Sequence, residues 1–235
     1  ALTDAFRKNL IKRGIDGDKI KVVTNGSNVE LFTPREKDAH IIENLDLKDK
    51  FVVAYIGTHG MAHSLEFIVN ALDKIHADDI HFLFIGDGAR KADIVRLAAN
   101  KGLMNITLLN PVSKDKVPDF MSVSDVALIP LRKSETFKTV IPSKIFEAAA
   151  MKKPILLGVE GQAQEIVEKY GAGLCFEPEN ESDFIRKLDE LKENPSLYNK
   201  LQEGCTKLAA DFDRKQLARK MYGYLEKIVK MGGKC

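Results

Sequence analysis

Basic side chains are concentrated between residues 130 and 153, in the stretch PLRKSETFKTVIPSKIFEAAAMKK. Six lysines and arginines occur there, against the two acidic residues Glu135 and Glu147. Such an excess of positive charge suits a polyanion, for example a diphosphate. A basic loop that is only solvated is the alternative interpretation.

Lys144 and Glu147 are the two residues of this stretch whose spacing could serve chemistry. Pro142 and Ser143 open a predicted helix, so Lys144 falls in its first turn, where a cation opposes the helix dipole. An anion bound beside the lysine would explain that placement. Glu147 follows three residues later on the same face, and its carboxylate could accept both hydroxyls of a ribose. A simple surface pair with Lys144 is the alternative for Glu147.

The elements that must position these residues follow a strand–helix alternation. Short apolar runs rich in valine, isoleucine and phenylalanine are separated by longer stretches with helical period. This pattern predicts an α/β fold, a Rossmann-like parallel sheet with helices on both faces. The expected strands are FVVAYIG from Phe51, HFLFIG from His81, ITLLN from Ile106, VALIP from Val126, PILLG from Pro154 and GLCFE around Cys175.

The remaining segments are predicted to be mostly helical. In residues 64–77 an apolar stripe predicts an amphipathic helix that carries Leu65, Ile68, Val69 and Leu72. Residues 181–230 predict helices with a break at NPSLY and no further strand. Residues 1–20 predict a helix, followed by a strand in IKVVTNG.

Ligands of an open parallel sheet bind beyond the carboxyl ends of its strands. The loops at that edge should therefore form the site. They are GTHGMAHS (57–64), GDGARK (86–91), NPVSKDK (110–116), residues 130–144 and GVEGQ (158–162).

Composition excludes several classes of protein. The 235 residues have a formal net charge of +2, and 44% are hydrophobic, as in a soluble globular protein. No apolar run is long enough for a membrane span, and no nucleic-acid partner is expected. The three cysteines show no C-x-x-C spacing and indicate a reducing compartment. They are Cys175, Cys205 and Cys235.

Other motifs are set aside. The run GDGARK is not G-x-G-x-x-G, because Lys91 takes the last position. The pairs Asp16–Asp18 and Asp211–Asp213 match a short D-x-D metal pattern, but they lie at helix boundaries, where aspartate caps helices and turns. His59 and His63 lack a third ligand nearby in the sequence, so no metal is expected.

Six segments occur in a characteristic order along the chain: KVVTNGSNVELFTP, VAYIGTHG, FLFIGDGARK, SDVALIPL, PSKIFEAAAMKKPILLG and GAGLCFEPEN. Taken together, they resemble the donor half of GT-B glycosyltransferases of the retaining family 4 type. The resemblance is nearer to bacterial surface-polysaccharide transferases that use amino-sugar nucleotides, and it covers about residues 20–210. It implies a terminal helix of a missing acceptor domain in residues 1–20, a donor-binding domain in 21–210 and a helix in 211–235 that packs back toward the missing domain.

The resemblance also implies roles for individual residues. Glu147 matches the glutamate that holds the ribose hydroxyls, and Val112 falls where backbone groups contact the base. Thr139, Val140 and Ile141 fall on the loop that approaches the diphosphate and the sugar. With Lys144 and Glu147 as the catalytic pair, the expected donor-binding residues are Thr58, His59, Gly60, Val112, Lys138, Thr139, Val140, Ile141, Ser143, Lys144 and Glu147.

The chain departs from the common family pattern at three positions. Thr139 replaces a second glutamate, Thr58 replaces an arginine, and His63 replaces a lysine, the last two of which grip the diphosphate in the family. We therefore infer that Lys144 takes over diphosphate binding. Lys138 or Arg132 would assist, and His59 is a further candidate.

The resemblance implies transfer of a sugar from a nucleotide-sugar donor, expected to be a UDP-sugar, to a glycan or lipid-linked acceptor with retention of configuration. Such an enzyme would act in surface-polysaccharide biosynthesis without a cofactor or an obligatory metal. The expected location is cytoplasmic, with peripheral contact to the inner face of the plasma membrane through the basic stretch FRKNLIKRG. The replaced residues motivate an alternative, a non-catalytic nucleotide-sugar-binding module or partner subunit. A GT-B sugar-nucleotide epimerase is the third reading.

Overall fold

The computed structural model describes residues 1–75 and 77–232. Its centre is a six-stranded parallel sheet in the order β3-β2-β1-β4-β5-β6. All six predicted strands are confirmed. One of the three cysteines, Cys235, lies outside the described residues. The strands are β1 (Phe51–Ile56), β2 (Ile80–Ile85), β3 (Ile106–Leu109), β4 (Val126–Pro130), β5 (Ile155–Gly158) and β6 (Gly173–Cys175).

The strand order reverses between β1 and β4. From β1 the chain moves outward through β2 and β3, and it then returns to place β4 on the other side of β1. In such sheets the crevice at the carboxyl ends of the strands on either side of the reversal is the usual ligand site. The topology therefore directs attention to the loops after β1, β2 and β4.

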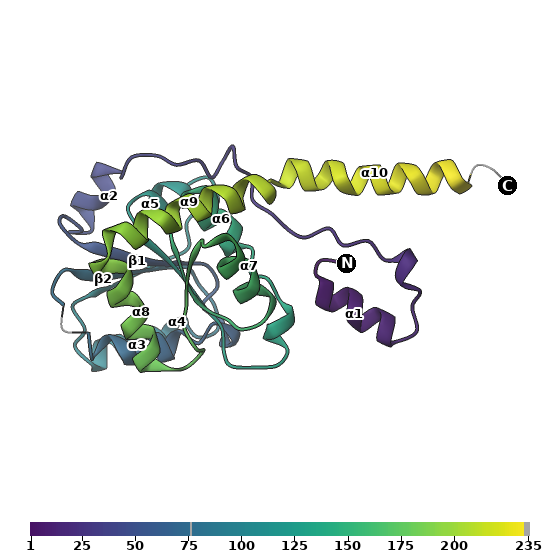
Figure 1. Ribbon diagram of the computed structural model, residues 1–235. Helices are drawn as coiled ribbons and strands as arrows, with labels where there is room; N and C mark the ends of the chain where they lie inside the picture. The colour runs from purple at the N-terminus through teal and green to yellow at the C-terminus, as the bar shows by residue number, and fades with distance from the viewer. Residues whose placement is uncertain (76, 233–235) are drawn as a thin grey trace.

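Helices cover both faces of the sheet (Figure 1), which is why the strands read as continuous apolar runs. One face packs on α3 (Leu65–Leu72), α4 (Lys91–Asn100) and α8 (Glu181–Glu193). The other packs on α2 (Ala39–Asn44), α5 (Val117–Ser122), α6 (Lys144–Ala150), α7 (Gln162–Tyr170) and α9 (Pro195–Asp211). Short 3-10 turns complete the fold as η1 (Gly17–Lys19), η2 (Met61–His63) and η3 (Phe137–Thr139).

Helix α6 is short and packed through small side chains. Ala148 and Ala149 are fully buried between α9 and strands β4 and β5. Alanine lets the helix approach its neighbours closely and also favours helix formation. The start of α6, at Lys144, is thereby held at the carboxyl edge of the sheet.

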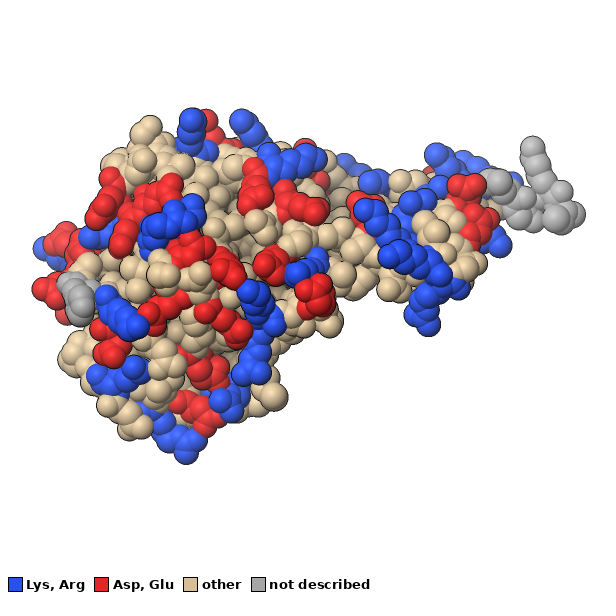
Figure 2. All heavy atoms as spheres, turned by 60° about the horizontal axis from the view of Figure 1, so that its bottom comes forward, with Lys and Arg blue, Asp and Glu red and all other residues tan. Residues whose placement is uncertain are grey.

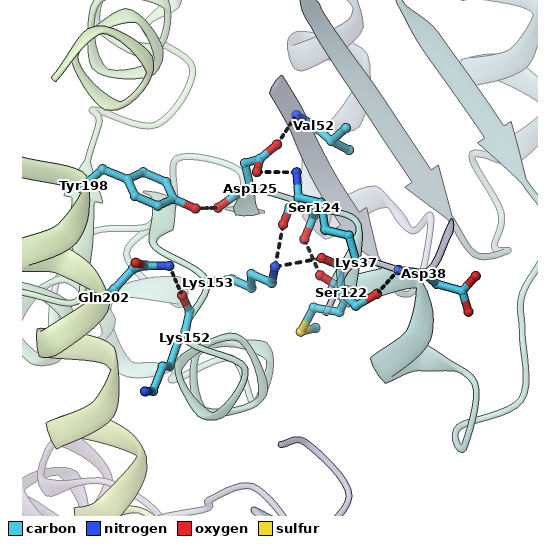
Figure 3. A network of polar contacts seen from close by, with 11 residues as sticks. Lys37, Asp38, Val52, Ser122, Ser124, Asp125, Lys152, Lys153, Tyr198 and Gln202 are labelled. Atoms are coloured by element: carbon cyan, nitrogen blue, oxygen red, sulfur yellow. Dashed lines mark hydrogen bonds and ion pairs between the residues drawn. The ribbon is translucent and has the colours of Figure 1, made fainter. Parts of the chain in front are cut away.

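A lysine after α6 fixes the opposite end of that helix (Figure 3). Lys153 Nζ donates hydrogen bonds to the carbonyl of Ser122 at 2.8 Å and to that of Ser124 at 2.7 Å. Burial lowers the pKa of Lys153 to about 8. These bonds tie the α6–β5 connection to the α5–β4 connection.

Asp125 extends the same network toward β1 and α9. Its carboxylate accepts from the backbone N–H of Val52 at 2.8 Å and pairs with Lys37 at 2.6 Å, while its carbonyl accepts from the Tyr198 hydroxyl at 2.8 Å (Figure 3). The amino ends of β1 and β4 are thus joined to α9 by hydrogen bonds rather than by packing alone.

The two ends of the chain lie beside the sheet domain rather than within it. Helix α10 (Arg214–Gly232) projects from the body, and α1 (Asp4–Lys12) lies on the same side of the molecule (Figure 1). The predicted break at NPSLY is confirmed: α8 ends at Glu193, and Asn194 caps α9 by accepting from the N–H of Leu197.

Two predictions about these elements are wrong. The strand expected in residues 20–26 does not form: this segment pairs with no strand of the described chain, and only an isolated bridge joins Ser27 to Asp213. The helix expected over residues 64–77 ends at Leu72. None of the helices in residues 1–75 and 77–232 is long and apolar enough to cross a membrane.

Candidate functional site

A hollow of about 390 Å³ opens at the carboxyl ends of β1, β2 and β3, against the start of α6. It coincides with the reversal of strand order, the position at which open α/β sheets bind ligands. A larger hollow of about 710 Å³ lies at the opposite edge, where β2 and β3 begin, away from α6. The first hollow is lined by Phe32, Ile56, Gly57, Thr58, Ile85, Gly86, Asp87, Pro111, Val112, Lys114, Val117, Ser143, Lys144 and Glu147.

Lys144 lies across the end of β1. Its Nζ is 5.5 Å from the centroid of the Tyr55 ring, and a Cβ placed on Gly57 would be only 2.4 Å from that nitrogen. Burial lowers the pKa of Lys144, and the nearby charge of Glu147 opposes the shift. Within the described residues, Lys144 makes no ion pair or side-chain hydrogen bond. Because buried charges are normally paired, a half-buried cation without such a partner is suited to binding an anionic ligand.

Glu147 faces the same hollow one turn further along α6. Burial raises the pKa of its carboxyl group, while Lys114, Lys144 and Arg214 act in the opposite direction. No donor in the described part of the chain bonds to its carboxylate, and Lys144 is not within ion-pair distance. The alternative of a simple Lys144–Glu147 pair is therefore not what the structure shows. The carboxylate is available to accept hydroxyl groups of a ligand.

The structure brings together some of the predicted residues and not others. Thr58, Val112 and Ser143 line the hollow with Lys144 and Glu147. The side chain of His59 does not line it, and Gly60 lies further along the same loop.

His59 is 0% exposed and lies beneath the loop after β1. Its ring centroid is 5.7 Å from that of Tyr55 and 6.4 Å from that of Phe84. Neither ring nitrogen has a hydrogen-bond partner in the described structure. Burial lowers the pKa of His59 to about 4, so the imidazole is neutral near pH 7. His59 shapes the loop and supplies no positive charge.

The predicted donor loop at η3 lies beside the hollow rather than in its wall. Lys138 pairs with Glu135 at 2.6 Å and with Glu160 at 3.5 Å, and so turns away from Lys144. The Thr139 carbonyl accepts a hydrogen bond of 3.3 Å from the Thr3 hydroxyl of the segment that leads into α1. Val140 and Ile141 continue this loop and are half-buried, like Lys138 and Thr139.

Nine of the fourteen residues that line the hollow were not among the predicted donor-binding residues, and three of them are instructive. Phe32 is 1% exposed and forms an apolar side of the hollow, and Asp87 follows β2. Lys114 lies in the loop after β3. The loops containing Asp87 and Lys114 were predicted to face the ligand, but loop position alone does not say which side chain turns inward. Nothing local marks Phe32, because its contact with α6 is a tertiary one.

The two D-x-D pairs have the structural roles expected of them. Asp16 caps η1 by accepting from the N–H of Asp18 at 3.0 Å. Asp213 accepts from the N–H of Lys215 at the start of α10, and Asp211 accepts from the Tyr170 hydroxyl at 2.5 Å. Among residues 1–75 and 77–232, no group of three or more histidine, cysteine or acidic side chains is arranged to hold a metal ion.

An open parallel sheet with a hollow at its strand reversal defines a Rossmann-like α/β domain suited to nucleotide ligands. Residues 36–208 match the family model described as "Glycosyl transferases group 1". The chain belongs to this family, whose fold is of the GT-B type.

Two curated relatives illustrate the match. The putative colanic acid biosynthesis glycosyl transferase WcaI of Escherichia coli (strain K12) is 26% identical over 185 residues, which cover 76% of this chain and 45% of the relative. The uncharacterized glycosyltransferase MJ1178 of Methanocaldococcus jannaschii is 30% identical over 207 residues, covering 88% and 53%. The chain spans about half the length of the curated relatives it matches.

Solved structures agree on the fold. A glycosyltransferase from Rickettsia africae ESF-5 superposes with a TM-score of 0.85 at 23% identity, covering 98% of this chain and 63% of its own. Anabaena Alr3699/HepE in complex with UDP and glucose superposes with a TM-score of 0.84 at 18% identity, covering 97% and 62%.

Proposed function

We propose that this chain is the donor-binding half of a retaining glycosyltransferase of family 4 type that uses a UDP-sugar. The observation that carries the proposal is the pair of half-buried side chains on one face of α6, Lys144 and Glu147, which have no ion-pair or hydrogen-bond partner among the described residues and lie at the strand reversal. A cation and a carboxylate one turn apart suit a ligand with adjacent phosphate and hydroxyl groups. The HepE complexes with UDP and with UDP-glucose support the choice of donor.

In this proposal each part of the hollow takes one part of the donor. The diphosphate lies at Lys144, beside Gly57, where the absence of a side chain permits close approach. The ribose hydroxyls bind Glu147, and the base lies against the backbone near Val112. Residues 138–141 move toward the diphosphate and the sugar when the donor binds. Thr58, Gly60 and Ser143 shape the phosphate end, and His59 supports it from below.

Lys144 is the residue we assign to the chemical step. As the bond between the sugar carbon and the diphosphate oxygen breaks, negative charge grows on the leaving diphosphate. A cation already placed beside that oxygen stabilises the transition state more than the ground state. Glu147 fixes the nucleotide so that the leaving oxygen meets the lysine. The proposed reaction retains configuration and requires no metal.

The acceptor would bind a further domain, against which the two ends of this chain pack. The solved neighbours match nearly all of this chain with only about 62–63% of their own length. Helix α10 exposes apolar side chains for which the described structure has no cover. They are Met221, Tyr222, Leu225, Ile228 and Val229.

We further propose a place in surface-polysaccharide biosynthesis, with a glycan or lipid-linked acceptor. Relatives named for colanic acid and teichuronic acid biosynthesis support that assignment. The proposed location is cytoplasmic, with the basic residues of α1 against the inner face of the membrane.

Calorimetry of UDP binding tests the proposal. We expect Lys144→Met and Glu147→Gln each to weaken UDP binding by about 1–3 kcal/mol, because each removes a charged partner of the ligand. Lys207→Met, an exposed position on α9, serves as the control and should bind UDP like the wild-type chain. Unchanged UDP affinity in both site variants would contradict the proposal.

A further inference from the structure

Lys114 lines the donor hollow from the loop between β3 and α5, on the side opposite α6. Its side chain is exposed and makes no ion pair or side-chain hydrogen bond within the described residues. Lys116, two residues further on, instead pairs with Asp119 at 3.6 Å. The two lysines of this loop therefore differ in orientation: Lys114 faces the ligand hollow, whereas Lys116 faces its own helix.

The carboxylate of Glu147 lies in surroundings that disfavour its charge. Beneath it is a small apolar recess formed with Ile56, Val117 and Met121. An unpaired carboxyl group in such a place is driven toward the neutral acid. The neutral acid accepts hydrogen bonds from hydroxyl groups less strongly than the carboxylate does, so this binding depends on neighbouring cations that favour the charged form.

Three cations face Glu147 from the elements packed around it. Lys144, on its own helix, lies across β1 over Tyr55. Arg214, at the start of α10, uses its guanidinium to donate to the Gly26 carbonyl at 2.9 Å. Of the three, Lys114 alone is without such a fixed neighbour in the described chain, and it lines the same hollow as the Glu147 carboxylate.

We propose that Lys114 is a positioning residue that keeps Glu147 ionised across the hollow, so that binding of the ribose hydroxyls depends on a cation from the base-side loop. The inference rests on the proposed function and adds to it a residue that acts through Glu147. In this proposal the loop after β3 acts on two parts of the nucleoside. Its backbone contacts the base, and the charge of Lys114 supports binding of the ribose.

The test is the pH dependence of UDP binding, measured by calorimetry between pH 5 and 8. Binding weakens on acidification as Glu147 gains a proton. Without Lys114 this weakening should begin at higher pH, because a nearby opposite charge lowers the pKa of a carboxyl group. We expect Lys114→Met to show this displacement, Lys114→Arg to follow the wild-type chain, and Lys116→Met to have no effect.

Two further binding measurements test whether Lys114 acts through Glu147. In a Glu147→Gln background, Lys114→Met should change UDP affinity little, since the group through which it acts is gone. With 2′,3′-dideoxyuridine diphosphate, which lacks the ribose hydroxyls, the Lys114→Met and wild-type chains should bind equally. Thermal unfolding of each variant confirms that it is folded.

The outcomes separate this inference from the proposed function. A wild-type pH profile for Lys114→Met, in a chain whose UDP binding depends on Glu147, overturns the inference alone. Equal losses for UDP and the dideoxy analogue show that Lys114 binds the phosphates directly and also overturn it. A wild-type chain that does not bind UDP overturns the proposed function and this inference together.

Discussion

At the scale of single residues, the spacing in the sequence predicted that Lys144 and Glu147 share one face of α6. It could not predict which side chains of the site are buried. Lys144 and Glu147 are three apart in a short helix, and helical geometry alone places them on one face, as the structure shows. His59 stands in a glycine-containing loop that predicts exposure, yet its ring is covered by Tyr55 and Phe84. That covering depends on β2, which is remote in sequence, so no local signal announces it.

His59 leads to a prediction about stability. Both ring nitrogens are buried without partners among the described residues, which costs free energy that an apolar side chain would not incur. We expect His59→Met to raise the free energy of unfolding by about 1 kcal/mol and to leave UDP affinity unchanged. Urea unfolding at pH 7.5 measures the first effect and calorimetry the second. A large loss of UDP affinity would instead return His59 to the donor site.

The same residue gives a pH dependence. The pKa of His59 is lowered to about 4 in the folded chain, from an ordinary value of 6.5. Between those values the unfolded chain holds the extra proton, so the stability due to neutral His59 is lost as the pH falls from 6.5 to 4. The His59→Met chain should show a shallower loss over that window; His63, whose pKa is also lowered to about 4, keeps part of it in both chains.

At the scale of elements, the sheet was predictable and the segment before it was not. Each predicted strand from β1 to β6 is an apolar run that finds neighbours on both sides or at one edge. Residues 20–26 are β-branched in part but also carry polar side chains, and no strand of the described chain pairs with them. Helix α3 is also shorter than predicted: the apolar stripe continues to Ile75, which is buried in the same core, but the helix itself ends at Leu72.

The hydrogen-bond network around Lys153, behind α6, predicts a second pH effect on stability, this time in the alkaline range. The pKa of Lys153 is lowered to about 8 in the folded chain, from an ordinary 10.5. Between those values the unfolded chain binds more protons at this site, so the contribution of Lys153 to stability rises with pH from 8 toward 10.5. Lys153→Met should abolish this rise, and Lys152→Met, at the exposed neighbouring position, should keep it. Urea unfolding at pH 7.5 and 9.5 measures both, and an equal rise in the two variants would contradict the assignment.

At the scale of the whole molecule, the distribution of surface properties is uneven. Lys, Arg, Asp and Glu are mixed over the sheet domain, whereas Lys and Arg predominate on the projecting part (Figure 2). On α10 these cations flank an apolar stripe that includes Leu225, 50% exposed, and Ile228, 65% exposed. Exposed stripes of this kind on a soluble chain mark a surface that is normally covered.

The isolated chain should therefore associate through α10. We expect sedimentation velocity to show concentration-dependent association, and Leu225→Glu to reduce it by placing a charge in the apolar stripe. Tyr224→Glu, on the same helix but outside that stripe, is the matched control and should associate more than Leu225→Glu. Chains that stay monomeric at every concentration would show that the stripe needs no cover.

The contact between Lys144 and Gly57 also limits how this site can change over evolutionary time. Gly57 has a φ of +150°, which side-chain-bearing residues rarely adopt, and the lysine occupies the space that any Cβ would need. Loss of the lysine removes only the second of these barriers, whereas a side chain at position 57 meets both at once. The backbone conformation therefore favours glycine at position 57 whichever residue stands at 144, whereas the lysine can be replaced while the glycine stays. A lineage that exchanges Lys144 for another phosphate-binding group still inherits the bare backbone at the end of β1, and with it a place where a new cation could be accommodated.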